Sequence, residues 1–215
     1  MKLLILIHRL PCPADRGSKL RAAAELRYLA KRHEVWCAGL LDSPGSPETH
    51  KALAELRNIC EAVAAIPLRS GMASARALGA LITGGTATEA YFSSKRLSSI
   101  VERWSAQVRF DAVLACSSSM APLALSVPAG RRVLDFVDID SRKWEESVTS
   151  SHFPMSLVYR TEANRLGRRE LQWMNDFDAS VVCAERETLL LGPDAPRDRG
   201  HVIESGAASD AATPL

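Results

Sequence analysis

The fold is decided by residues 3–41, which read LLILIHRLPCPADRGSKLRAAAELRYLAKRHEVWCAGLL. The apolar run 3–7 is followed by a loop with two prolines, a helix-length stretch from Gly17 and a second apolar run at 34–41. Two strands joined by a helix form a βαβ unit, whose strands lie parallel in one sheet. Strands without polar alternation are typical of a sheet buried on both faces. The helix residues expected to face the core are Leu20, Ala24, Leu26 and Leu29.

The same alternation of short apolar runs and helix-length segments continues along the chain. Further strands are predicted at residues 61–68, 111–117, 131–140, 178–184 and 200–205. Further helices are predicted at residues 46–60, 72–84, 93–108, 154–177 and 185–191. This order predicts an α/β fold with a mostly parallel sheet and helices on both faces. No linker interrupts residues 1–204, so we expect one domain there.

The composition, with 47% hydrophobic and 24% charged residues, is that of a soluble globular protein. A net charge of +2 gives no argument for nucleic acid as a partner. No stretch approaches the ~20 apolar residues that cross a bilayer, and His8 and Arg9 cut the first apolar run too short for a signal peptide. The five cysteines form no C-x-x-C pair, and three lie in predicted strands. We therefore expect free thiols in a cytoplasmic protein.

The loop after the first predicted strand is the first candidate ligand site. In an open α/β sheet, ligands bind at the carboxyl ends of the strands, where this loop lies. Pro11 and Pro13 stiffen it, and Gly17 lets the backbone turn into a helix whose unpaired N–H groups attract anions. With Lys19 and Arg21 in the first turn, the loop is suited to a phosphate. The alternative is a stiff turn with solvated basic side chains, because neither glycine-rich nucleotide motif is present.

Carboxylates gather at the end of another predicted strand, in RRVLDFVDIDSRKWEE, residues 131–146. If the chain is extended there, Asp138 and Asp140 point the same way. The acidic residues, with Asp135 before them, are suited to hold sugar hydroxyls or to bind a divalent cation. Alternatively they cap the helix that follows, with Asp140 or Ser141 as the N-cap. The pattern leaves all three roles open.

Hydroxyl groups follow the strand before that one. Ser117, Ser118 and Ser119 suit hydrogen bonding to a polar ligand or capping of the next helix, and no G-x-S-x-G marks a hydrolase nucleophile. Of five histidines without metal-ligand spacing, His8 alone ends a strand, and there a packed or capping role is favoured over a catalytic one. The Arg-rich segment 164–170, NRLGRRE, predicts a solvated helix face, with contact to anionic lipid or phosphate as the alternative.

Five segments, taken together and in this order, carry a resemblance to a known family. They are HRLPCPADRGSKLRAAAELRYLAKRHEV (8–35), RFDAVLACSSSMA (109–121), RRVLDFVDIDSRKW (131–144), YRTEANRLGRRE (159–170) and FDASVVCAERE (177–187). The chain resembles the amino-terminal half of a GT-B glycosyltransferase of family 4. It is most similar to the sugar transferases associated with exopolysaccharide and PEP-CTERM/exosortase gene clusters.

This resemblance implies a Rossmann-like, doubly wound domain that forms the acceptor side of a retaining glycosyltransferase. Such an enzyme uses a nucleotide-sugar donor in bacterial polysaccharide synthesis, without a metal or another cofactor, and the implied acceptor is a glycan or a lipid-linked glycan. Peripheral contact with the inner face of the membrane is compatible with this activity. The donor-binding half is absent from residues 1–215, so the chain alone is expected to be inactive.

The resemblance also implies which residues form the site. The donor-facing, phosphate-binding loop comprises Asp15, Gly17, Lys19 and Arg21. The acceptor cleft comprises Ser117, Ser118, Asp138, Asp140, Lys143 and Glu185. Residues 1–204 would be the acceptor-side domain and 205–215 a remnant of the interdomain linker, in which Ser205-Gly206-Ala207-Ala208 replaces the usual Asn-Gly-Val-Asp.

Two alternatives remain beside the transferase. One is a non-catalytic module, derived from such an enzyme, that binds a glycan, a lipid-linked acceptor or a protein. The other is a single-domain transferase that uses Asp138 and Asp140 with manganese.

Overall fold

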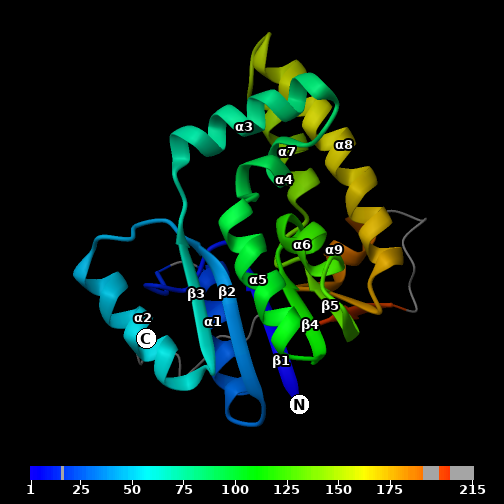
Figure 1. The fold of residues 1–215 in the computed structure, drawn as a ribbon. Helices are drawn as coiled ribbons and strands as arrows, with labels where there is room; N and C mark the ends of the chain where they lie inside the picture. The colour runs from blue at the N-terminus through cyan, green and yellow to red at the C-terminus, as the bar shows by residue number, and fades with distance from the viewer. Residues whose placement is uncertain (16, 191–198, 204–215) are drawn as a thin grey trace.

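A parallel sheet of seven strands, in the order β3-β2-β1-β4-β5-β6-β7, runs through the computed structural model (Figure 1). The structure describes residues 1–15, 17–190 and 199–203, so the predicted linker at 205–215 lies outside the described residues. The strands are β1 (Lys2–Ile7), β2 (Glu34–Leu41), β3 (Ala62–Pro67), β4 (Phe110–Cys116), β5 (Ala129–Asp135), β6 (Ala179–Val182) and β7 (Gly200–Val202). Every neighbouring pair is parallel.

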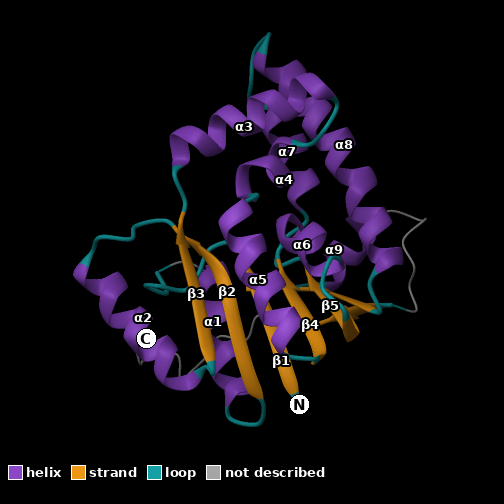
Figure 2. Ribbon diagram, in the orientation of Figure 1, coloured by secondary structure: helices purple, strands orange, loops and turns teal. Residues whose placement is uncertain are grey.

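Helices cover both faces of this sheet (Figure 2), which confirms the predicted Rossmann-like α/β fold. The helices are α1 (Gly17–Ala30), α2 (Pro47–Ile59), α3 (Ser70–Thr83), α4 (Ala87–Phe92), α5 (Lys95–Gln107), η1 (Ser118–Met120), α6 (Ala121–Leu125), α7 (Asp140–Thr149), α8 (Met155–Asp176) and α9 (Glu185–Leu190). Within the described residues, no helix is long and apolar enough to cross a membrane.

The core consists of two apolar clusters, one on each face of the sheet. Successive side chains of a strand point to opposite faces, and β1 divides its residues in this way. Leu4 and Leu6 pack with residues of α5, α6 and α8, whereas Ile5 and Ile7 pack with residues of α1 and α2. Burial on both faces explains why β1 reads as an unbroken apolar run.

The predicted core face of α1 is right for two of its four residues: Leu26 is buried and Leu29 packs against the core, whereas Leu20 and Ala24 are exposed. The helix also buries Ala22 and Ala23 together with two basic residues, Lys19 and Arg21. The reason is electrostatic, because each buried basic side chain has an acidic partner on the sheet side of the helix. These ion pairs rotate the helix away from the orientation that apolar periodicity alone would favour.

Two buried carboxylates of α8 hold the starts of two other helices. Glu162 accepts hydrogen bonds from the amides of Ala87 (2.6 Å) and Thr88 (2.9 Å), which begin α4. Glu170 accepts from the amide of Ser141 (3.2 Å) in the first turn of α7. Burial raises the pKa of Glu170 to about 7, although the hydrogen bonds from Ser141 oppose the shift. Since the first amides of a helix have no partner within the helix, α8 positions α4 and α7 beyond the carboxyl ends of the strands.

Candidate functional site

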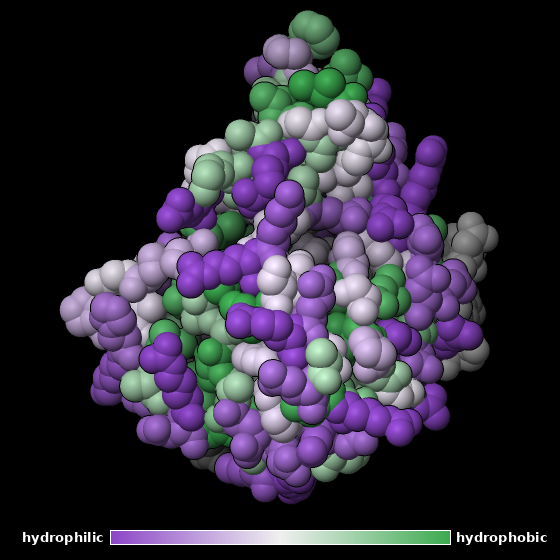
Figure 3. All heavy atoms as spheres, viewed as in Figure 1, coloured by the Kyte–Doolittle hydropathy of each residue, from purple (hydrophilic) through white to green (hydrophobic). Residues whose placement is uncertain are grey.

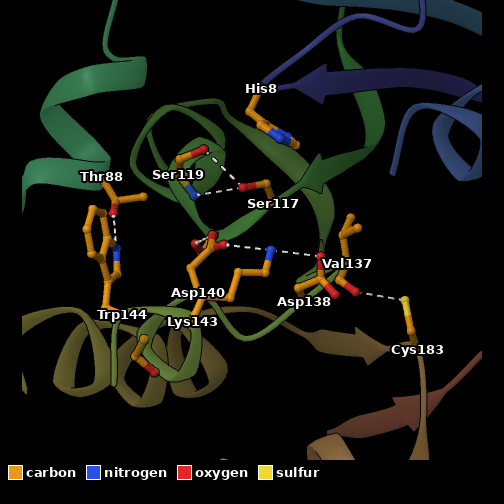
Figure 4. A network of polar contacts seen from close by, with 12 residues as sticks. His8, Thr88, Ser117, Ser119, Val137, Asp138, Asp140, Lys143, Trp144 and Cys183 are labelled. Atoms are coloured by element: carbon orange, nitrogen blue, oxygen red, sulfur yellow. Dashed lines mark hydrogen bonds and ion pairs between the residues drawn. The ribbon is translucent and has the colours of Figure 1, made fainter. Parts of the chain in front are cut away.

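The loops that follow β1 and β4 diverge at the carboxyl edge of the sheet. The two strands are neighbours, but the chain continues from β1 towards β2 and from β4 towards β5. A divergence of this kind opens the crevice in which α/β proteins bind their ligands. His8 follows β1, Ser117–Ser119 follow β4, and Asp138, Asp140 and Lys143 follow β5; these polar side chains converge in Figure 4.

The backbone is strained at the ends of β4 and β5. Among the described residues, positive φ outside glycine occurs at Ser117 (89°) and Val137 (63°). Asp135, the last residue of β5, stabilises both of these residues. Its backbone carbonyl accepts a hydrogen bond from the amide of Ser117 (2.7 Å), and its side-chain Oδ1 accepts one from the amide of Val137 (2.9 Å). The Cys183 thiol also donates to the Val137 carbonyl (2.8 Å). Strain maintained by surrounding contacts is typical of functional sites.

The serines after β4 contact the protein itself. Ser117 caps the short helix η1: its Oγ accepts from the amide of Ser119 (3.4 Å) and lies 3.0 Å from the Ser119 Oγ. Ser118 is fully buried and donates its hydroxyl to Asp140 Oδ2 (2.9 Å). The expectation that Ser117 and Ser118 line the cleft is therefore corrected, because both are buried and hold neighbouring groups in place.

Asp138 and Asp140 are brought together by Lys143. The Lys143 Nζ lies 2.8 Å from Asp138 Oδ2 and 3.3 Å from Asp140 Oδ1. The two carboxylates do not share a strand face as predicted, because β5 ends at Asp135 and Asp140 already begins α7. The alternative, in which Asp140 or Ser141 is the N-cap of that helix, is wrong: Ile139 occupies the N-cap position, and Glu170 accepts the Ser141 amide. The Lys143 ammonium group supplies the positive charge that this carboxylate pair would otherwise take from a bound metal cation.

His8 lies between β1 and β4 with its ring packed on α4. Its Nδ1 is 3.3 Å from the carbonyl oxygen of Cys116, and its ring meets that of Phe92 edge-on at 5.2 Å. A carbonyl only accepts, so Nδ1 carries the proton and Nε2 is the acceptor of the neutral ring. Burial lowers the pKa of His8, and the charge of Asp140 opposes the shift. The packed role predicted for His8 is confirmed. Because His8 lies where the loops after β1 and β4 diverge, the topological switch point of the sheet, it is part of the candidate site.

Lys19 does not face a ligand groove. It is 4% exposed, and its Nζ lies 3.4 Å from Asp42 Oδ2 and 3.3 Å from Asp15 Oδ1. Arg9 adds a second contact to Asp42, at 3.0 Å. The predicted phosphate-binding role of Lys19 is therefore corrected: with Asp15, it anchors the loop to the end of β2.

Arg21 is also committed inside the fold. Its Nε lies 2.8 Å from Asp135 Oδ2 and 3.0 Å from Glu25 Oε1, and its Nη1 donates to the carbonyl of Ile203 (2.8 Å). Burial and the nearby Asp135 raise the pKa of Glu25 to about 8. The predicted phosphate contact is corrected for the Nε edge of the guanidinium, which pairs with the Asp135 carboxylate and contacts Glu25. Arg21 is nevertheless among the residues that line the cavity at the start of α1. Sequence reasoning missed Glu25, since nothing in its local pattern points to Asp135.

A cavity of about 500 Å³ opens where α1 begins. It is bounded by the first turn of α1, by the end of β5 and by the start of α9, and its lining residues include Gly17, Ser18, Val137, Asp138 and Arg186. A Cβ added at Gly17 would meet nothing within 4 Å, so a side chain there would extend into open space. The predicted proximity of Gly17 and Asp138 is thus observed, whereas Glu185, at the first position of α9, is not among the lining residues.

A larger cavity, of about 850 Å³, lies between α4, α5, α6 and α8. Its wall is largely apolar, with Phe92 and Met120 among the lining residues, and Ser119 connects it to the serines after β4. All three arginines of the NRLGRRE segment line it. Arg165 donates to backbone carbonyls, Arg169 pairs with a glutamate of α4, and Arg168 is exposed. The Arg-rich face therefore joins α8 to α3 and α4 rather than facing solvent alone.

The described residues contain no group of three or more His, Cys, Asp or Glu side chains that could hold a metal ion. No family model matches the chain, and no curated protein matches it. The resemblance to family 4 glycosyltransferases therefore stays a prediction.

Proposed function

We propose that this chain is the acceptor-side domain of a retaining, nucleotide-sugar-dependent glycosyltransferase of bacterial polysaccharide synthesis. Transfer then requires a donor-binding domain facing the carboxyl edge of the sheet. The observation that carries the proposal is the cavity beside Gly17, which joins the start of α1 to the end of β5 at a topological switch point.

Gly17 supports a contact between this edge and a diphosphate. No neighbouring atom of the described fold excludes a Cβ at Gly17. Close approach of an external group to the backbone is one condition that does favour glycine. The amides at the start of α1, a helix of 14 residues, are suited to an anion. In this proposal the donor diphosphate lies against the first turn of α1.

The larger cavity supports the acceptor side of the same proposal. It combines an apolar wall at Phe92 and Met120 with hydroxyl groups such as those of Ser93 and Ser119. Its end at Ser119 lies beside the switch point, where Ser119 contacts Ser117. Sugars bind to surfaces that offer apolar faces together with hydrogen-bonding groups. We therefore assign the acceptor glycan to this cavity and its reacting end to the region of His8 and Asp140.

A second candidate is a non-catalytic glycan-binding module, and the ion pairs favour it. A transferase must stabilise the charge of the departing diphosphate. Lys19, Arg21 and Lys143, which are the basic residues predicted for the site, are each paired with carboxylates of this chain. If Arg186, which lines the cavity beside Gly17, does not contact the diphosphate and no cation is supplied across the cleft, the domain would bind an acceptor without catalysing transfer.

Binding and transfer experiments separate the two candidates. The full chain is titrated calorimetrically with UDP, GDP and a panel of bacterial oligosaccharides, and it is also fused to the donor-binding domain of a family 4 enzyme to measure sugar transfer. Gly17→Trp fills the cavity beside α1, while Gly45→Trp is a matched control whose added Cβ also meets nothing within 4 Å.

For a transferase domain, we expect the fusion to transfer sugar and Gly17→Trp, but not Gly45→Trp, to abolish transfer. Oligosaccharide binding without transfer by the fusion would support the binding module. A Gly17→Trp fusion as active as its parent would refute the donor contact.

A further inference from the structure

An apolar surface extends beyond the carboxyl edge of the sheet, on helix α3 and on the turn between α7 and α8. In α3, which is described throughout, Ala73 is the one buried residue. Leu78 and Ile82 of this helix are 61% and 78% exposed, and Phe153 in the turn is 81% exposed. Figure 3 shows apolar atoms gathered at this end of the molecule, where Figure 1 places α3 and the α7–α8 turn.

Apart from the buried Ala73, helix α3 is held in place by hydrogen bonds. Arg76 donates to the carbonyls of Ala90, Tyr91 and Ser93 at the end of α4. Arg165 of α8 donates to the carbonyls of Leu81 and Gly85 at the end of α3. These hydrogen bonds fix the helix by its backbone and by one polar side chain. Its exposed face is consequently available to a partner, and a change there leaves the described contacts intact.

The two parts of the surface lie close together. Arg165, which contacts the end of α3, is ten residues from Met155, which begins α8 beside the turn. With a rise of 1.5 Å per residue, this separation is about 15 Å along α8. One flat partner can therefore contact α3 and the α7–α8 turn at the same time.

The charge of these segments points to an anionic partner. The sequence contains no acidic residue from Leu68 to Thr88 or from Ser147 to Thr161, whereas it contains Arg69, Arg76 and Arg160 there. Arg69 and Arg160 are exposed, the first at the N-cap of α3 and the second in the second turn of α8. An exposed apolar helix face bordered by arginines is the pattern of proteins that lie on anionic bilayers, with the apolar side chains inserted and the cations at the headgroups.

We propose that this surface docks the protein on an anionic lipid bilayer. Leu78, Ile82 and Phe153 insert at the level of the acyl chains, and Arg69 and Arg160 contact the lipid phosphates. The inference rests on α3 and the turn alone, so it stands or falls independently of sugar transfer.

The test is co-sedimentation of the full chain with vesicles made of equal parts of phosphatidylcholine and phosphatidylglycerol, compared with phosphatidylcholine alone. We expect binding to the mixed vesicles that falls as salt is raised, because salt screens the contact with phosphates. Replacing both Leu78 and Ile82 by Asn is expected to weaken binding at least about tenfold, and Arg160→Gln about fivefold. Tyr28→Ser, an exposed aromatic at the far end of α1, is the matched control and should bind like the wild type.

Three results would overturn the proposal. The first is equal sedimentation of the wild type and the Leu78/Ile82 variant, and the second is equal sedimentation of the wild type with both kinds of vesicle. The third is a dimer in light scattering that the double substitution dissociates while no vesicle is bound, since the surface would then cover a second copy of the chain. Far-UV circular dichroism verifies that the variant is folded. Phe153→Ser tests the α7–α8 turn separately and is expected to weaken vesicle binding as well.

Discussion

Replacing Arg21 by Met tests whether this residue supports the fold or serves a ligand. Asp135 is 2% exposed, and Arg21 is its charged partner at 2.8 Å. Arg21→Met preserves most of the length of the side chain but leaves the Asp135 carboxylate buried without its cation. Removing one member of a buried ion pair costs about 3–5 kcal/mol. For a chain of this size, that corresponds to a fall in Tm of roughly 6–20 °C.

The assay is urea unfolding of the full chain followed by circular dichroism. In the double variant Arg21→Met with Asp135→Asn, the buried group is neutral, so we expect at least about half of the lost stability to return. Arg103→Met is the matched control, because it makes the same change on an exposed turn of α5, where substitutions usually change stability by less than about 0.5 kcal/mol.

An Arg21→Met variant that unfolds at the same urea concentration as the wild type would refute this reasoning. Asp135 would then not depend on Arg21, and the guanidinium would be available to a phosphate as the sequence suggested. No additional recovery with Asp135→Asn, after a large loss in the single variant, would also contradict the ion-pair explanation, since the loss would then come from packing.

Three further predictions concern stability and can be measured by the same urea unfolding. Glu162→Ala is expected to lower the free energy of unfolding by about 2–5 kcal/mol, because two amides of α4 lose their acceptor. The control, Glu146→Ala at an exposed position, should lower it by less than about 0.5 kcal/mol. Similar losses for both variants would refute the capping role of Glu162. Gly39→Ala is expected to destabilise by at least about 1–3 kcal/mol, because the new Cβ would collide with the carbonyl oxygen of Ile7; a stable variant would show that β1 and β2 can separate there. Because burial raises the pKa of Glu170 to about 7, its contribution to stability is present below about pH 4.5 and is lost as the pH rises through 7. The loss is about 3 kcal/mol, and Glu170→Gln should flatten this part of the pH profile; an unchanged profile would exclude Glu170 as its source.

The strands could be predicted from the sequence because both faces of the sheet are buried. Residues 34–41 were predicted as a strand, and β2 has these bounds. The short helices α4 and α6 were not predicted, and α4 shows why. It has six residues and depends on the carboxylate of Glu162, which is more than 70 positions away in the sequence. A helix that is stabilised by a distant side chain leaves little trace in its own sequence.

The candidate site was predicted only in part, because the sequence shows which residues follow a strand but not which distant side chains pair with them. The rule that ligands bind at the carboxyl edge brought Gly17 and Asp138 together correctly. It failed for Lys19 and Arg21, because their partners, Asp42 and Asp135, cannot be paired with them from spacing alone. The strained ends of β4 and β5 could not be predicted either, since neither Ser117 nor Val137 is a residue type that favours positive φ.

These ion pairs change which atoms are available to an anion at α1. Lys19 and Arg21 pair with carboxylates of the protein, so a diphosphate in the cavity would be met by the backbone amides at Gly17 and Ser18 and by Arg186, which also lines the cavity. Ligand binding by backbone amides does not depend on the identity of the neighbouring side chains, but a bulky side chain placed over the amides blocks it. Lys19 and Arg21 substitutions should therefore lower stability, whereas Gly17→Trp should lower ligand affinity and leave stability nearly unchanged. A ligand affinity that falls with Lys19→Gln at constant stability would show that this lysine exchanges Asp42 for the ligand.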